Sequence, residues 1–168
     1  FLLIGYWKHL PEGRQGARMA LAVTGAGGLA MIGGMLILGE IAGSYKLTDI
    51  LAQGEAIRAS DWYLPALILI LIGAFAKSAQ FPFHFWLPNA MAAPTPVSAY
   101  LHSATMVKAG VFLLARMHPA LAGSDVWLWT LTIFGGVTAV FASVMALRQT
   151  DLKQSLAYTT LMALGTLT

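Results

Sequence analysis

The sequence predicts an all-α protein, a polytopic bundle of transmembrane helices in which one helix is broken by proline. Hydrophobic residues make up 58% of the chain and charged residues only 10%, whereas soluble domains carry about 25% charged residues. The mean hydropathy is +0.71. Polar segments divide the chain into apolar stretches of about the 20 residues that a helix needs to cross a bilayer core. The chain opens on Phe1 and closes on Thr168 inside an apolar run, so we expect a fragment of a longer membrane protein.

The composition argues against several classes of function. The 10 basic residues are spread thinly and form no stripe interleaved with aromatic residues, so nucleic-acid binding is not expected. The absence of cysteine excludes disulfides, thiolate metal sites and cysteine nucleophiles. The glycines of the first apolar segment follow no strand, so they indicate close helix packing and not a phosphate-binding loop. We expect no cofactor and no metal site.

The apolar segments define the expected spans, and the polar connection over 40–61 is expected to carry a short interfacial helix near 47–56. The spans are 1–7 as the end of a helix, 17–38, 62–81 followed by a half-helix at 83–91, 97–117, 126–147, and the start of another helix at 154–168. The loops on one face carry Lys8, Arg14, Arg18, Arg148 and Lys153, and the opposite face carries Lys46, Arg58 and Arg116. The positive-inside rule therefore places the first face in the cytoplasm.

The segment 62–91 is too long for one transmembrane helix. Uninterrupted, it would extend about 45 Å at 1.5 Å per residue. Pro82 removes a backbone donor and pushes its predecessor out of helical dihedrals, and Pro88 repeats the effect. We therefore expect a helix break at these prolines, between the half-helices 62–80 and 83–91.

Three ionisable side chains are expected at bilayer depth: Lys77, His102 and Lys108. A charge at that depth costs roughly 2.5 to 3.5 kcal/mol on insertion scales, so such residues usually mark an ion path. His102 and Lys108 lie on one polar strip of the helix 97–117. Because burial disfavours the charged form of a lysine, a buried lysine can take up and release protons near neutral pH. His84, on the short half-helix, is a further candidate.

Structural roles are the alternatives for these residues. Lys77 and Lys108 are then packing lysines, with Lys77 bonded to a free carbonyl at the break. His102 is then a neutral histidine bonded to a neighbouring helix, and His84 an interfacial one. A broken helix with a charge near the midplane, beside a second charged helix, is nevertheless typical of secondary transporters.

The motifs at 77–88, 93–99 and 102–110 resemble the antiporter-like proton-translocating membrane subunits shared by respiratory complex I and the multisubunit Mrp (Pha) cation/proton antiporters. The first motif reads KSAQFPFHFWLP and the third HSATMVKAG. The resemblance extends to 1–7, similar to the end of the family's fifth helix, and to 151–158, similar to the junction into the tenth.

The resemblance implies a role for each matching position. Lys77 corresponds to the central proton carrier on the family's broken seventh helix, and Pro82 to the break itself. His102 and Lys108 correspond to relay positions on the eighth helix. The glutamate that partners the lysine belongs to the fifth helix and would precede Phe1. Lys108 and Asn89 are more typical of the large A subunit of Mrp antiporters than of complex I relatives.

The expected function is therefore that of a proton-conducting subunit of a Na⁺ or K⁺/proton antiporter in a bacterial cytoplasmic membrane. The resemblance implies a secondary transporter and not an enzyme, with the other antiporter subunits and the lipid bilayer as partners. One alternative is a proton-translocating subunit of complex I, NADH:quinone oxidoreductase, where the same helices belong to a redox enzyme. Another is a passive assembly scaffold.

Overall fold

The computed structural model describes residues 2–81, 83–100, 107–121 and 125–167. Its elements, in chain order, are α1 (Pro11–Ala42), α2 (Leu47–Ala52), α3 (Gly54–Ala59), α4 (Tyr63–Lys77), the 3₁₀ turn η1 (Phe83–Phe85), α5 (Trp86–Asn89), the 3₁₀ turn η2 (Ala90–Ala92), α6 (Thr95–Ala99), α7 (Lys108–Leu121), α8 (Asp125–Leu147) and α9 (Leu152–Leu167). All regular structure within these ranges is helical, which confirms the predicted all-α class.

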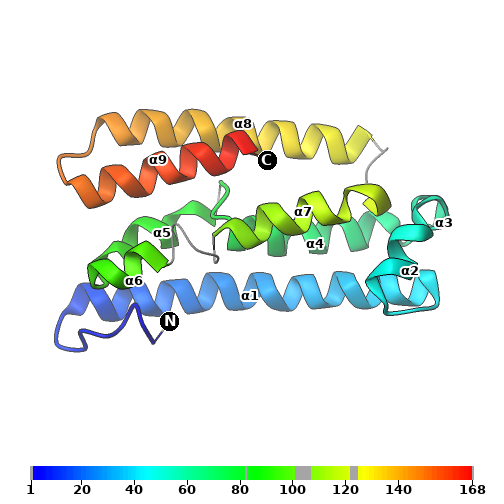
Figure 1. Cartoon of the computed structure of the whole chain (residues 1–168), viewed down its shortest axis with the longest axis horizontal. Helices are drawn as coiled ribbons and strands as arrows, with labels where there is room; N and C mark the ends of the chain where they lie inside the picture. The colour runs from blue at the N-terminus through cyan, green and yellow to red at the C-terminus, as the bar shows by residue number, and fades with distance from the viewer. Residues whose placement is uncertain (1, 82, 101–106, 122–124, 168) are drawn as a thin grey trace.

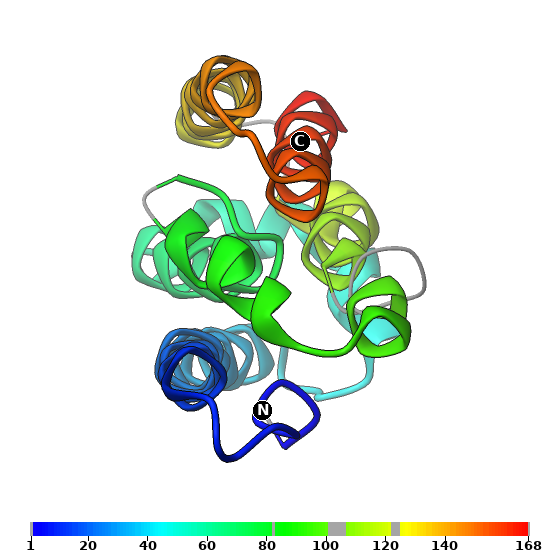
Figure 2. The same cartoon turned by 90° about the vertical axis from the view of Figure 1, so that its left-hand side faces the viewer.

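The long helices lie side by side in three layers (Figure 1, Figure 2). The first layer is α1, the middle layer holds α4 and α7, and the third is the antiparallel pair of α8 and α9. The short helices α2 and α3 connect α1 to α4 at one end of the bundle. At the other end α5 continues the middle layer beyond the end of α4 (Figure 1), so the interruption between α4 and α5 lies inside the bundle.

The contact between α1 and α4 depends on glycines of the first apolar segment. A Cβ at Gly34 would lie 3.0 Å from the carbonyl oxygen of Ala66, and a Cβ at Gly73 would lie 2.7 Å from that of Gly27. Side chains at these positions would separate the helices. The close packing predicted for the first segment is therefore present at Gly27 and Gly34, whereas Gly25 faces open space.

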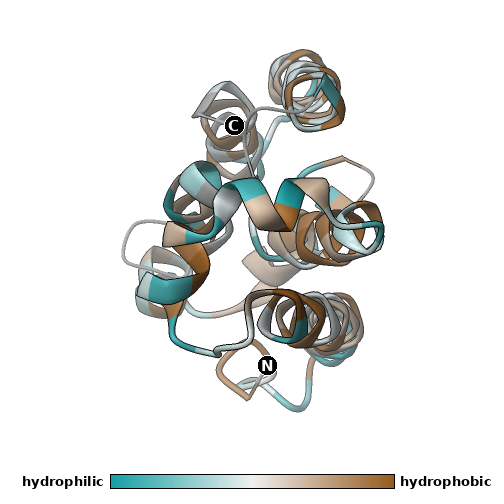
Figure 3. Cartoon of the chain, turned by 90° about the vertical axis from the view of Figure 1, so that its right-hand side faces the viewer, coloured by the Kyte–Doolittle hydropathy of each residue, from teal (hydrophilic) through white to brown (hydrophobic). Residues whose placement is uncertain are grey.

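Large apolar side chains point outward from the long helices. Leu29 of α1 is 72% exposed and Val140 of α8 is 67% exposed. By length and hydropathy α1 and α8 can each cross a membrane, and α4 is a shorter apolar helix. Hydrophilic residues concentrate in the short helices at one end of the bundle (Figure 3). This distribution matches a protein whose sides contact lipid and whose ends contact water.

The first residues are not the helix end predicted for 1–7. They form turns, in which the N–H of Tyr6 donates to the carbonyl of Leu3 at 3.4 Å. The first long helix is also longer than the predicted 17–38. It begins at Pro11, since proline suits the first helical position, and ends before a left-handed Gly43 with φ of 70°.

The predicted span 97–117 is occupied by α6 and α7, and residues 101–106 between them lie outside the described ranges. α7 passes through Pro119, beyond the predicted end of the span at residue 117. In the last turn of a helix a proline removes a single backbone donor, so the chain stays helical for two more residues. The interfacial helix predicted near 47–56 is the pair α2 and α3, and α8 and α9 begin one and two residues before the predicted 126 and 154.

Candidate functional site

The interruption of the middle layer begins at the end of α4, three residues before the predicted end at residue 80. α4 ends at Lys77, and Ala79 adopts a left-handed conformation with φ of 54°. The N–H of Gln80 donates to the carbonyl of Phe75 at 2.9 Å. This bond and the left-handed residue define a Schellman C-cap, which usually has glycine at the position of Ala79.

Every carbonyl of the preceding three residues accepts a hydrogen bond. The N–H and the hydroxyl of Ser78 both donate to Ala74 at 2.9 Å. The carbonyl of Phe75 accepts the Gln80 N–H. The carbonyl of Ala76 accepts the indole N–H of Trp86 at 2.9 Å, from the first residue of α5. These three carbonyls of the last turn of α4 are therefore all paired.

The two prolines named as the break have different outcomes. Pro82 lies outside the described residues. Pro88 does not break a helix: it is buried within the short α5, in the first turn, where its missing N–H has no helical acceptor to lose. The interruption seen in the structure is caused by the capped end of α4. A left-handed residue cannot be recognised in advance when it is an alanine, because this conformation is disfavoured for any residue with a Cβ.

Lys77 is the last residue of α4 and is half-buried. The helix dipole places partial negative charge at this end, so an ammonium is favoured here. Within the described residues, no hydrogen bond or ion pair involves its side chain. A packing lysine bonded to a free carbonyl at the break, the structural alternative, is therefore not what the described ranges contain.

Lys108 lies in a different environment from the one expected. The sequence placed it near the middle of a continuous helix, but it is the first residue of α7 and is exposed in this chain. Residues 101–106, directly before this helix, lie outside the described residues, so the interior position expected for Lys108 in the full protein stays a prediction. Gly110, two residues later, packs against Ser78 at the end of α4. The start of α7, with Lys108, is thus a neighbour of the end of α4, with Lys77. His102 lies outside the described residues.

His84 sits in an aromatic cage within the interruption. Its ring is stacked on Phe81 with centroids 5.4 Å apart and an interplanar angle of 12°. The ring centroid of Phe141 in α8 is 4.6 Å away, and that of Phe85 is 6.4 Å away. The Nδ1 atom of His84 is buried, and no described residue gives it a hydrogen bond. The structure therefore places His84 beside the interruption and against α8.

Three polar residues at or next to the interruption were not predicted from the sequence: Thr138, Ser78 and Gln80. Thr138 of α8 is 1% exposed, accepts the N–H of Phe81 at 2.8 Å and donates to Phe134 at 2.7 Å. Ser78 and Gln80 are fully buried polar residues in the turn. The only signal for Thr138 was a small polar residue within an apolar helix, and such a residue often bonds no further than the preceding turn of its own helix.

Lys153 was expected to be a loop charge and is instead a structural contact. Its ammonium donates to the carbonyl of Ala93 at 3.0 Å and to that of Met91 at 3.5 Å. The neighbouring Gln154 donates its amide N–H to the carbonyl of Pro88 at 3.1 Å. These contacts attach the start of α9 to the second half of the broken helix. They form the α9 clasp, defined here as Lys153 and Gln154.

Cavities surround the interruption and the ends of the bundle. An apolar cavity of about 450 Å³ lies between α1, α4, Phe83 and Phe85, and another of about 350 Å³ lies between α4, α8 and Phe83. A polar cavity of about 370 Å³ lies beside the α9 clasp, with Glu12 and Asp151 in its wall. The turn after Lys77 is therefore bordered by apolar space, while polar space lies at the end of the bundle.

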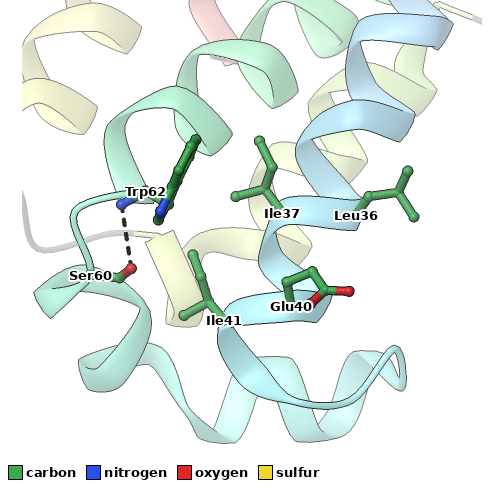
Figure 4. A pocket seen from close by; sticks show the side chains of 6 residues that line it. All are labelled: Leu36, Ile37, Glu40, Ile41, Ser60 and Trp62. Carbon is green, nitrogen blue, oxygen red and sulfur yellow. Dashed lines mark hydrogen bonds between the residues drawn. The ribbon is translucent and has the colours of Figure 1, made fainter.

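A cavity of about 500 Å³ at the opposite end is far from these residues. It is lined by the last turns of α1 and by Ser60 and Trp62 (Figure 4). Its one carboxylate, on Glu40, accepts a hydrogen bond of 2.9 Å from the hydroxyl of Tyr45. This hydrogen bond, together with the negative charge of Glu40, raises the pKa of Tyr45 above its usual value. Glu40, in the last turn of α1, is therefore engaged in a local contact.

In the described part of the chain no group of three or more His, Asp or Glu side chains is arranged to hold a metal ion. The arrangement at the end of α4 offers a single ammonium, a caged imidazole and a dense set of hydrogen bonds. Such groups can transfer protons, and they contain no nucleophile with a partner base.

The family model and the relatives compared with this chain all carry names of antiporter proteins. The family model described as "NADH:quinone oxidoreductase/Mrp antiporter, TM" matches residues 1–168. A protein of Rhizobium meliloti (strain 1021), named as the probable A/B subunit of a K(+)/H(+) antiporter, is 59% identical over 168 residues, which are 100% of this chain and 17% of the relative. The A subunit of a Na(+)/H(+) antiporter of Alkalihalophilus pseudofirmus is 52% identical over 164 residues, covering 98% of this chain and 20% of the relative.

A solved structure has the same fold. The chain matches part of the "Structure of Mrp complex from Dietzia sp. DQ12-45-1b" with a TM-score of 0.90 and 44% sequence identity, over 97% of this chain and 18% of the matched chain. This chain therefore spans about a fifth of the length of the proteins that it resembles.

Proposed function

The chain belongs to the NADH:quinone oxidoreductase/Mrp antiporter transmembrane family, and from this membership we propose that it is part of the proton path in the large A subunit of a multisubunit cation/proton antiporter. The full protein exchanges Na⁺ or K⁺ for protons across a bacterial cytoplasmic membrane. Its partners are the other antiporter subunits, and it acts as a secondary transporter and not as an enzyme. The relatives named as antiporter subunits support this assignment over the complex I alternative.

The observation that carries the proposal is the position of Lys77. It is an ammonium at the last residue of an apolar helix, inside the bundle, with the three preceding carbonyls bonded to other donors. Within the described ranges no acceptor holds this ammonium, and a lysine without a fixed acceptor is able to exchange its proton with a mobile partner.

In the proposed mechanism Lys77 accepts a proton on Nζ from one side of the membrane and releases it toward the other. His84, His102 and Lys108 are the proposed relay groups around it. Between these groups each transfer breaks one N–H bond and forms another, and at the two ends of the path the proton comes from an O–H bond of water and returns to one. The dipole of α4 stabilises the protonated state between the two transfers.

The test is proton flux in everted membrane vesicles that contain the full-length complex. We expect Lys77→Ala to abolish antiport while assembly is retained. Lys77→Arg is expected to be nearly as defective, because a guanidinium does not release its proton at physiological pH. Lys46→Ala, which removes the same charge from an exposed site on the outer connection, is the matched control and should leave antiport unchanged.

Normal antiport by Lys77→Ala in a correctly assembled complex would contradict the proposal. It would leave the chain as a structural part of the complex, which is the scaffold alternative. A coupled loss of quinone reduction and proton pumping, with no cation dependence, would favour the complex I alternative instead.

A further inference from the structure

We infer that Trp86 is a positioning residue for Lys77, and that its indole N–H holds the end of α4 in the geometry that leaves the lysine free to exchange protons. This inference rests on the role proposed above for Lys77. It concerns a side chain that is not itself protonated or deprotonated in the path.

The hydrogen bond of Trp86 replaces a backbone contact. In a complete Schellman cap the carbonyl of the next-to-last helical residue also accepts a backbone N–H. Here the carbonyl in that place belongs to Ala76, the residue directly before Lys77, and it accepts the indole N–H at 2.9 Å. The donor is ten residues further along the chain, on the other side of the interruption. A single side chain therefore joins the two halves of the broken helix next to the lysine.

The surroundings of Trp86 make this bond difficult to replace. The residue is 0% exposed, so water does not reach its N–H or the Ala76 carbonyl from the side of the indole. A buried polar group that loses its partner is destabilised by the full cost of desolvation. Asn89 also holds this segment in place, because its side-chain N–H donates to the carbonyl of Phe85 at 2.7 Å. The ring of Trp86 is thus fixed by its own turn as well as by its hydrogen bond.

Loss of the indole N–H would affect Lys77 through the carbonyl of Ala76. Without the indole donor, the Ala76 carbonyl becomes an unpaired acceptor one residue from the ammonium. An ammonium has three donors and no acceptor of its own, so it bonds to such a carbonyl and is retained in its charged form. Proton release from Lys77 then becomes slower, whereas the binding of the transported cation elsewhere in the full protein is unaffected.

The experiment replaces the N–H and keeps the shape of the side chain. In the full-length protein, 3-benzothienylalanine is inserted at position 86 by amber suppression, which places sulfur where the indole has N–H. Tryptophan inserted by the same method is the reference. We expect the maximal antiport rate per assembled complex to fall about tenfold, which is about 1.4 kcal/mol. The half-saturating cation concentration should change by less than about twofold, since uniform binding is intact.

Two further variants separate positioning from general stability. Trp86→Phe should reproduce the loss of rate if it assembles, because it also lacks the donor. Trp127→Phe removes another buried indole, in the first turn of α8 and away from the interruption, and should leave the rate per assembled complex unchanged. A benzothienylalanine protein with the rate of the reference would overturn the inference, and so would an equal loss of rate in Trp127→Phe.

The inference and the proposed function fail in different ways. If Lys77→Ala abolishes antiport and the benzothienylalanine protein is normal, only the inference on Trp86 is wrong. If Lys77→Ala is normal, the proposed role of Lys77 is wrong, and with it the positioning role of Trp86.

Discussion

Gly110 of α7 packs directly against the carbonyl group of Ala74 in α4, and no side chain fits between the two helices. A Cβ on residue 110 would also lie 3.0 Å from the Cβ of Ser78. The approach brings the beginning of α7, with Lys108, to the end of α4, with Lys77. The position of the start of α7 against the end of α4 therefore depends on the absence of a side chain at Gly110.

Gly110→Ala is expected to reduce the amount of assembled complex and the antiport rate, because the backbones of α4 and α7 must separate to admit the methyl group. The measurement is the yield of assembled complex on a native gel, followed by transport. Gly136→Ala in α8 is the control. A Cβ there meets open space, and alanine is favoured over glycine in a helix by about 1 kcal/mol. Equal yields for both variants would show that the close contact is not required.

Thr138→Val is expected to lower the stability of the protein by about 1 to 3 kcal/mol, because the buried N–H of Phe81 then lacks its acceptor while the side-chain volume is unchanged. A thermal-shift assay on the purified complex measures the effect. Thr132→Val makes the same substitution at an exposed position of α8 and should not change the melting temperature. Similar melting temperatures for the two variants would mean that the Phe81 N–H finds another partner.

Lys153→Met is expected to loosen the second half of the broken helix, since the ammonium of Lys153 donates to two carbonyls at the end of that segment. Hydrogen exchange in peptides that cover 86–93 should become about tenfold faster, which corresponds to the loss of one charge-assisted hydrogen bond of about 1.5 kcal/mol. Lys46→Met, on the opposite end of the bundle, is the control. Unchanged exchange in 86–93 would contradict a clasp by α9.

The contact between Tyr45 and Glu40 predicts a dependence on alkaline pH. Because the pKa of Tyr45 is raised by the hydrogen bond to Glu40 and by its charge, the neutral phenol is favoured in the folded state. The stabilisation is present below the ordinary tyrosine pKa and is lost as the pH rises through the raised value. An ultraviolet titration should show one late-ionising tyrosine in the wild type. Glu40→Gln should move that ionisation to lower pH, and the absence of any movement would contradict the assignment.

The sequence was a good guide to the class of fold and to the segment that contains the interruption, and a poor guide to its cause. Apolar length identified 62–91 as too long for one helix, and the helix does stop within it. The predicted half-helix reached residue 80, whereas α4 ends at Lys77, and the break assigned to Pro82 stays a prediction because Pro82 lies outside the described residues. The actual cap uses an alanine with positive φ, which no local preference favours.

The contacts around the interruption could not be predicted from the sequence, because they join residues that are far apart along the chain. Trp86 bonds to a residue ten positions away, Thr138 to one 57 positions away, and Lys153 to one 60 positions away. Each is an ordinary residue in its own segment, and only the packing of α5, α8 and α9 around α4 gives it a partner. Lys108 is the first residue of α7, and the residues before 107 in the predicted span 97–117 are described only as far as residue 100, so its predicted position within a continuous helix stays a prediction.

The end of α4 is held by hydrogen bonds, and no proline lies within three residues of it. Ser78, Ala79 and Gln80 contain no proline, so helical dihedrals are open to all three residues, and only Pro82 sets a permanent limit. Extension over these residues would lengthen α4 by about 4.5 Å and would require Trp86 and Gln80 to give up their present acceptors. The hydrogen bonds of Trp86 and Gln80 therefore keep Lys77 at the last residue of α4 and not one turn inside a longer helix.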